Sequence, residues 1–180
     1  MRPPEKVVFG HTVEGLLAVL EGHLEGPLRA SLKDVGLDLD AKLAPAYPKH
    51  QWHQMLLLGA AALFPHLAPA QAHWQLGQRF VTAYFSTRMG RALQGVLKLL
   101  GPARTLERTA RNMASGNNYL RVDVERLAPT DYRLKVSEGG VHPEFIGALC
   151  HFGTLTTGVK NLTTVVEAHE EASATYRMRW

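Results

Sequence analysis

The chain has 180 residues, 46% of them hydrophobic and 20% charged, so it is long enough to bury a sizeable core. Its one cysteine, Cys150, excludes an internal disulfide framework and is typical of a reducing compartment. No apolar run reaches the roughly 18 residues that a membrane span needs, and Met1 leads into patterned sequence rather than a signal peptide. We therefore expect a soluble cytoplasmic protein.

Residues 1–115 carry the apolar spacing of helices. The sequence predicts helices from about Thr12 to Leu24 and over residues 28–35, 50–63, 70–100 and 105–113. The helix over 70–100 is predicted to be the longest, because no proline interrupts it and Gly101-Pro102 follows. Its apolar positions step by three or four along one predicted face: Val81, Phe85, Met89, Ala92, Val96 and Leu99.

At Gly116-Asn117-Asn118 the hydrophobic period changes to that of strands. Alternating residues predict a hairpin over 120–137, a helix follows over 143–158, and two last strands cover 163–168 and 172–180. The sequence thus predicts one α+β domain over residues 1–180. Its helical half (1–115) precedes a half (116–180) in which one helix is inserted between the two hairpins of a four-stranded antiparallel sheet.

Basic residues gather between positions 79 and 111, with Glu107 as the only acid in that stretch. A solvated helix face is the simplest interpretation, and an anionic ligand or an acidic partner are the alternatives. Nucleic acid is not an expected partner, because no recognised motif is present and aromatic residues are not interleaved with the basic ones. The basic residues are Arg79, Arg88, Arg91, Lys98, Arg104, Arg108 and Arg111.

No motif predicts an enzyme, a metal site or a cofactor, and we expect no catalytic residue. His50 and His53 would share a helix face, but no third metal ligand is suggested nearby. Cys150 and His151 are adjacent on the predicted helix and point apart, so a nucleophile pair is not expected.

The stretch LKVSEGGVHPEFIGAL, from Leu134 to Leu149, resembles the hairpin-to-helix passage of haem nitric-oxide/oxygen-binding (H-NOX) domains. The pattern of residues 150–180 is equally similar to vinyl-reductase regulatory domains and to TRAPP trafficking subunits, which share that fold. This resemblance implies an H-NOX-like fold with a pocket between the helical half and the sheet.

Several segments also resemble a paralogous family expanded in myxobacteria, from which no activity can be carried over. The segments are FGHTVEG (Phe9 to Gly15), Phe80 to Arg91, Leu100-Gly101-Pro102, Gly116 to Tyr119 and YRMRW (Tyr176 to Trp180).

The H-NOX resemblance implies a test for haem. Haem-binding members use a histidine shortly before the hairpin and a Tyr-x-Ser-x-Arg set that holds the propionates. Here the three positions of that set fall on Leu134, Val136 and Glu138, and no histidine lies between His73 and His142. We therefore expect no haem. The alternative that stays open is a gas sensor with an unusual haem ligand, for which the candidates are His50, His53, His142 and His151.

Our first hypothesis is a non-enzymatic sensory or regulatory module that binds a small apolar, lipid-like or anionic ligand between helices and sheet. The candidate ligand-binding residues are Tyr84, Arg88, Arg91 and Tyr119. The second hypothesis is a protein–protein interaction module of the TRAPP type, including a homodimer.

Overall fold

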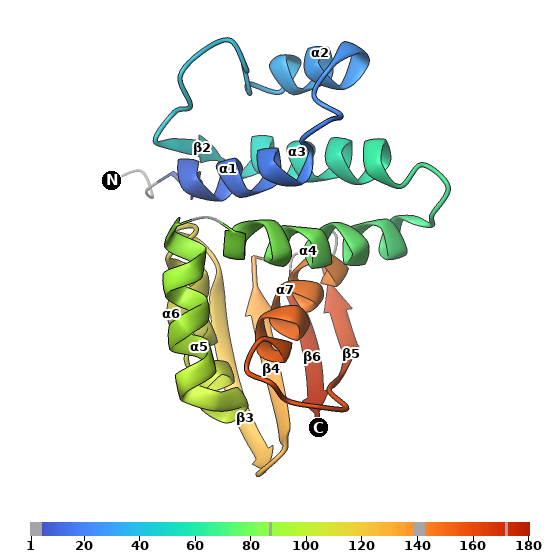
Figure 1. The fold of residues 1–180 in the computed structure, drawn as a ribbon. Helices are drawn as coiled ribbons and strands as arrows, with labels where there is room; N and C mark the ends of the chain where they lie inside the picture. Colours follow the sequence, from blue (N-terminus) through green and yellow to red (C-terminus); the bar gives the residue numbers. More distant parts are fainter. Residues whose placement is uncertain (1–4, 87, 139–142, 172) are drawn as a thin grey trace.

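A computed structural model describes residues 5–86, 88–138, 143–171 and 173–180 of the chain. Helices form the first half, and a four-stranded sheet with one inserted helix forms the second (Figure 1). The predicted α+β architecture is therefore confirmed. Two short strands that the sequence did not predict, β1 (Val7–Phe9) and β2 (Ala46–Pro48), pair antiparallel within the helical half.

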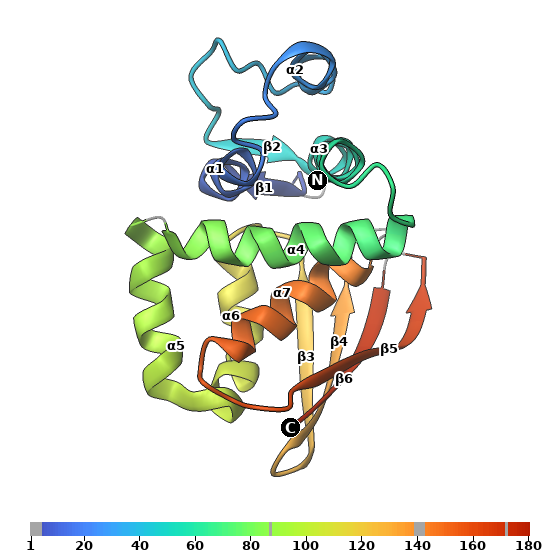
Figure 2. The same cartoon turned by 45° about the vertical axis from the view of Figure 1, so that its right-hand side comes forward.

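The helical half is layered above the sheet. Helices α1 (Gly10–Val19) and α3 (Lys49–Leu63) lie on one side of α4 (Pro69–Ser86), and α2 (Gly26–Asp34) lies beyond them (Figures 1 and 2). On its other side α4 packs against α7 (Pro143–Leu155), which covers one face of the sheet. Helix α4 is thus the central layer, and both halves of the chain bury apolar side chains against it.

The sheet has the antiparallel order β3-β4-β6-β5. Its strands are β3 (Arg121–Ala128), β4 (Asp131–Ser137), β5 (Thr163–Glu170) and β6 (Ser173–Arg179). The predicted alternation holds, because the same face of the two central strands buries its side chains and the other stays polar. The buried residues of these two strands are Tyr132, Leu134, Val136, Ala174, Tyr176 and Met178.

The junction Gly116-Asn117-Asn118 ties the two halves together. The backbone N–H of Phe9 donates to Gly116 O at 2.9 Å, and the N–H of Asn118 donates to Val7 O at 3.2 Å. The side-chain oxygen of Asn117 accepts from the backbone N–H groups of Tyr119 and Leu120, at 3.1 and 2.7 Å. Its side-chain nitrogen donates to Met113 O at 3.0 Å. These contacts end the last helix of the helical half and lead into β3, the first strand of the sheet.

The prediction of one helix over 70–100 is wrong. Helix α4 ends at Ser86, and α5 (Arg88–Glu107) leaves it at a steep angle to run beside α6 (Thr109–Ala114), which lies between α5 and the sheet (Figure 2). Gly90 permits this arrangement, because a Cβ at that position would overlap the carbonyl oxygen of Tyr84. The predicted apolar stripe is broken accordingly, since Val96 and Leu99 are exposed on α5.

Two smaller boundaries also differ from the sequence prediction. The first helix ends at Val19, so Leu24 lies beyond it, and Trp180 follows the last strand rather than belonging to it. Gly101 has φ 75° and ψ 175°, which breaks α5 at the predicted Gly101-Pro102 stop, although a further helical turn continues to Glu107. No helix in the described part of the chain is long and apolar enough to cross a membrane.

Candidate ligand-binding pocket

A cavity of about 180 Å³ lies where α4, α5, α6 and α7 meet the junction between the halves. Helix α7 presents one continuous face to it, because its lining residues recur at the spacing of a single helix stripe. Those residues are Phe145, Ile146, Leu149, Cys150, Gly153 and Thr154. The other lining residues that the argument below uses are Trp52, Phe80, Tyr84, Leu93, Leu97, Thr105, Thr109, Asn112, Tyr119 and Leu120.

An aromatic cluster forms the floor of the cavity. The ring of Phe80 lies edge-to-face with Trp52 and Phe145, at centroid distances of 6.3 and 5.7 Å. The ring of Tyr84 stacks on Phe80 at 6.2 Å with an angle of 7° between the planes. Such geometries are those that aromatic pairs prefer, so this part of the pocket is pre-formed by its own packing.

Two glycines set the shape of the pocket in opposite ways. At Gly77 in α4 an added Cβ would lie 2.6 Å from the Cβ of Ala148 in α7, so the two helices cross as closely as backbones allow. At Gly153, which lies on the pocket face of α7, an added Cβ would meet no atom within 4 Å. The cavity therefore exists in part because this position lacks a side chain.

The described lining has no permanently charged side chain, and its titratable residues include His53 and His73. Among the described residues around the cavity there is no lysine, arginine, aspartate or glutamate. Lys49 lies against the ring of the lining residue Tyr119, with its Nζ 5.2 Å from the ring centroid. It donates to Glu138 Oε2 at 2.7 Å, and Lys6 donates to the other carboxylate oxygen at 2.6 Å. Both lysines are thus paired with an acid at the rim.

The four candidate residues from the sequence are placed differently. Tyr84 and Tyr119 line the cavity, and burial raises the pKa of both hydroxyls. Arg91 is exposed on α5 and donates to the carbonyl oxygen of Ser86, so it does not reach the lining. The side chain of Arg88 lies outside the described part of the structure. Ligand contact by the two tyrosines stays a prediction.

Gly153 and Thr105 line the pocket and were not predicted from the sequence. A glycine on the apolar face of the predicted 143–158 helix was the available signal for the first. Thr105 gave no signal, because its burial depends on how the chain turns after Gly101.

The candidate histidines are not gathered at one point. His53 lines the cavity, His50 is exposed, and His151 contacts Thr164 Oγ1 at 3.0 Å on the far side of α7. His142 lies outside the described residues. Within the described ranges no three His, Cys, Asp or Glu side chains are placed to hold a metal ion.

The described residues do not fit a haem. Leu134 and Val136 are buried in the sheet core, and Glu138 is committed to two lysines. No described lining residue is a lysine or an arginine that could pair with a propionate. A cavity of about 180 Å³ compares with engineered apolar cavities of about 150 Å³ that bind benzene, whereas a macrocycle of four pyrroles is several times larger.

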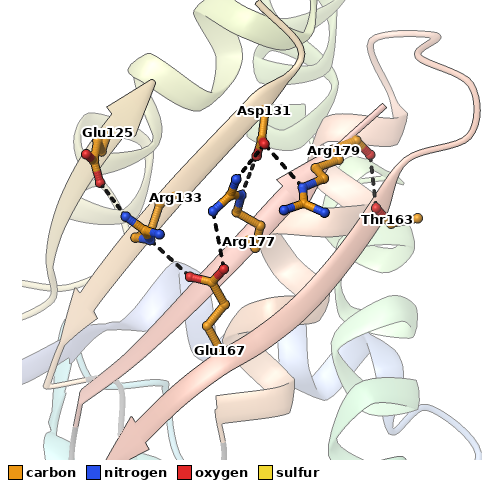
Figure 3. A network of polar contacts seen from close by, with 7 residues as sticks. All are labelled: Glu125, Asp131, Arg133, Thr163, Glu167, Arg177 and Arg179. Carbon is orange, nitrogen blue, oxygen red and sulfur yellow. Dashed lines mark hydrogen bonds and ion pairs between the residues drawn. The ribbon is translucent and has the colours of Figure 1, made fainter. Parts of the chain in front are cut away.

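A second polar cluster lies on the open face of the sheet, away from α7 (Figure 3). Arg133 bonds Glu125 and Glu167 at 2.9 and 3.0 Å, and Arg177 pairs with Asp131 and Glu167. Arg179 joins Asp131 at 3.2 Å. Three arginines and three carboxylates therefore neutralise one another, and this face is not an anion-binding surface.

Several solved structures with a similar fold are H-NOX domains. An unliganded Fe(II) H-NOX mutant from K. algicida superposes with a TM-score of 0.67 at 11% identity, over 95% of each chain. A Tt H-NOX mutant gives 0.66 at 11% identity, over 95% of this chain and 94% of that one. An oxygen-binding H-NOX domain related to soluble guanylate cyclases gives 0.61 at 11% identity, over 94% and 93%. At such identity the likeness establishes an H-NOX-like fold.

Residues 6–180 match the family described as "Protein of unknown function (DUF2378)", and the chain belongs to that family. No curated protein sequence matches it.

Proposed function

We propose that the protein is a non-enzymatic sensory or regulatory module whose pocket binds a small, uncharged, mainly apolar molecule without haem. The H-NOX-like fold supports the sensory part, because one similar structure is described as an oxygen-binding domain. The observation that carries the ligand class is the mainly apolar cavity between α4, α5, α6 and α7, whose described lining has no lysine, arginine, aspartate or glutamate.

Charge decides between the apolar and the anionic ligand. An anion buried in a low-dielectric pocket needs a cation or several N–H donors to replace its hydration. The described lining offers no lysine or arginine, and the rim lysines already hold Glu138. An uncharged molecule of about the size of benzene needs no such partner, so the pocket favours it.

The experiment fills the pocket from Gly153. A leucine there would project from α7 into the space that the cavity occupies, whereas Gly95 in α5, also with open space around it, does not line the cavity. Toluene at about ten times its Kd stabilises a protein that binds it by about 1.4 kcal/mol, or about 3–6 °C for a chain of this size. We expect that rise for the wild type and Gly95→Leu, and none for Gly153→Leu.

Gly153→Leu should itself melt higher than the wild type without toluene, because it replaces a helical glycine and buries apolar surface. If toluene raises the melting temperature of all three proteins equally, or of none, the pocket does not bind such molecules and the proposal fails.

A second candidate function is self-association through α5. Leu99 and Val96 are one turn apart and 89% and 47% exposed, which is unusual for large apolar side chains. We expect sedimentation equilibrium to show a dimer that Leu99→Glu dissociates. A wild-type protein that stays monomeric at high concentration would exclude this role.

A further inference from the structure

The Thr105 hydroxyl is a buried polar group in the pocket wall. Its residue is only 4% exposed, and within the described part of the chain its Oγ1 has no hydrogen-bond partner. It lines the cavity. A buried hydroxyl normally has a partner, since leaving it unpaired costs the free energy of its lost hydration.

The backbone explains why this hydroxyl has no partner in its own helix. A helical threonine commonly donates to the carbonyl four residues earlier, as Thr109 does to Thr105 O at 3.2 Å. For Thr105 that carbonyl belongs to Gly101, whose φ of 75° and ψ of 175° are not helical. The break at Gly101-Pro102 therefore removes the usual acceptor and leaves the Thr105 hydroxyl for the cavity.

The wall around Thr105 is polar. Thr105 in α5 and Thr109 and Asn112 in α6 follow one another at steps of four and three across the junction of the two helices, and all three line the cavity. The facing walls from α4 and α7 are mainly aromatic and aliphatic. The pocket is thus mainly apolar and polar along one wall, with no lysine, arginine, aspartate or glutamate among its described residues.

We propose that the natural ligand is a small apolar molecule with one uncharged oxygen, such as a phenol or an alcohol, and that this oxygen bonds the Thr105 hydroxyl. This inference rests on the proposed function and adds the chemical class of the ligand and the residue that orients it. This wall offers hydroxyl and amide groups, and the described lining has no lysine or arginine for a carboxylate and no aspartate or glutamate for an ammonium group.

The test compares phenol with toluene, because the two differ only in a hydroxyl against a methyl group of similar size. Affinities of both for the wild type, Thr105→Val and Thr109→Val are measured by titration calorimetry. Thr105→Val keeps the shape and removes the unpaired hydroxyl. Thr109→Val is the matched control, since its hydroxyl lies on the same wall and already has an acceptor.

We expect the preference for phenol over toluene to fall about 3- to 10-fold in Thr105→Val, the fold-change of one neutral hydrogen bond, and to persist in Thr109→Val. Thr105→Val should be at least as stable as the wild type without ligand. Thr105→Ala, which also lacks the hydroxyl, should show the same loss and replaces Thr105→Val if that variant does not fold.

The remaining outcomes separate the two claims. If both molecules bind but the preference is the same in Thr105→Val, or falls equally in Thr109→Val, the role of Thr105 is refuted while the apolar pocket stands. If neither molecule binds the wild type, the proposed function fails, and the assignment of Thr105 fails with it.

Discussion

The ion pairs of Glu138 link the hairpin to the helical half and make a specific prediction about pH. Lys49 and Lys6 donate to the two carboxylate oxygens at 2.7 and 2.6 Å. Hydrogen bonds from Lys49 first and Lys6 second lower the pKa of Glu138 from 4.5 to about 2. Because the folded state holds the carboxylate form, this stability is present above pH 4.5 and is lost as the pH falls toward 2.

The magnitude follows from the pKa and the exposure. A pKa lowered from 4.5 to about 2 corresponds to about 3 kcal/mol at full strength. The Glu138 side chain is 35% exposed, and solvent screens such pairs, so we expect about 1–2 kcal/mol for the two bonds together. Glu138→Gln should lose this amount of unfolding free energy at pH 7.

Urea unfolding of the wild type and Glu138→Gln from pH 7 down to pH 2 measures the effect. The difference should shrink below pH 4.5, because the protonated carboxyl is as neutral as the amide. Glu125→Gln is the control: its pair with Arg133 is 59% exposed on the acid side, and we expect a change under about 0.5 kcal/mol. A Glu138→Gln difference that is absent at pH 7, or unchanged at pH 2, would refute the reasoning.

Three further predictions concern packing, the junction and the buried thiol. Gly77→Ala should lower the unfolding free energy by about 1–3 kcal/mol, because its Cβ would collide with α7. Gly95→Ala should raise the unfolding free energy by about 0.5–1 kcal/mol, because it replaces a helical glycine in open space. Equal urea midpoints for the two variants would contradict the close crossing of α4 and α7. Asn117→Ala removes three hydrogen bonds at a buried site and should lower the unfolding free energy by about 2–3 kcal/mol. Thermal unfolding should show a smaller loss for Asn118→Ala, whose side chain is exposed. The reverse order would contradict the role of the junction. Burial raises the pKa of the Cys150 thiol to about 12. A thiol reagent at pH 8 should therefore label the folded protein slowly and the urea-unfolded protein at once. Rapid labelling of the folded protein would mean that the cavity is open to the reagent.

The sheet could be predicted from the sequence, because its signal is local. In β4, Tyr132, Leu134 and Val136 alternate with polar residues, and all three are fully buried. The order of hairpin, helix and hairpin followed from turn residues and a change of period. The pairing of β4 with β6 could not be derived in this way, because it joins residues about 40 positions apart.

The turn between α4 and α5 escaped prediction, because no proline marks it and the apolar spacing runs on through it. Its only signal in the described residues is Gly90. A single glycine inside a helical pattern usually indicates a less stable helix and does not predict a turn. This turn determines which face of α5 is buried. Leu93 and Leu97 line the cavity, whereas Val96 and Leu99, which were predicted to lie on the apolar stripe, are exposed.

The sequence predicted a pocket between the helices and the sheet, whereas no residue of β3, β4, β5 or β6 is among the described lining of the cavity. Tyr84 and Tyr119 line the cavity, and Arg91 is exposed and donates to Ser86 O. The basic residues suggested an anionic ligand because charge is visible in a sequence and burial is not. Thr105 and Gly153 matter through what surrounds them, and only the tertiary structure supplies that.

The central claim is that this H-NOX-like pocket takes a small uncharged molecule and not haem. Its most direct test is a titration of the purified protein with haemin, followed by absorption, beside a titration with toluene, followed by calorimetry. We predict saturable toluene binding that Gly153→Leu abolishes, and no stoichiometric Soret band. A Soret band that saturates at one haem per chain, in a protein that ignores toluene, would contradict the account.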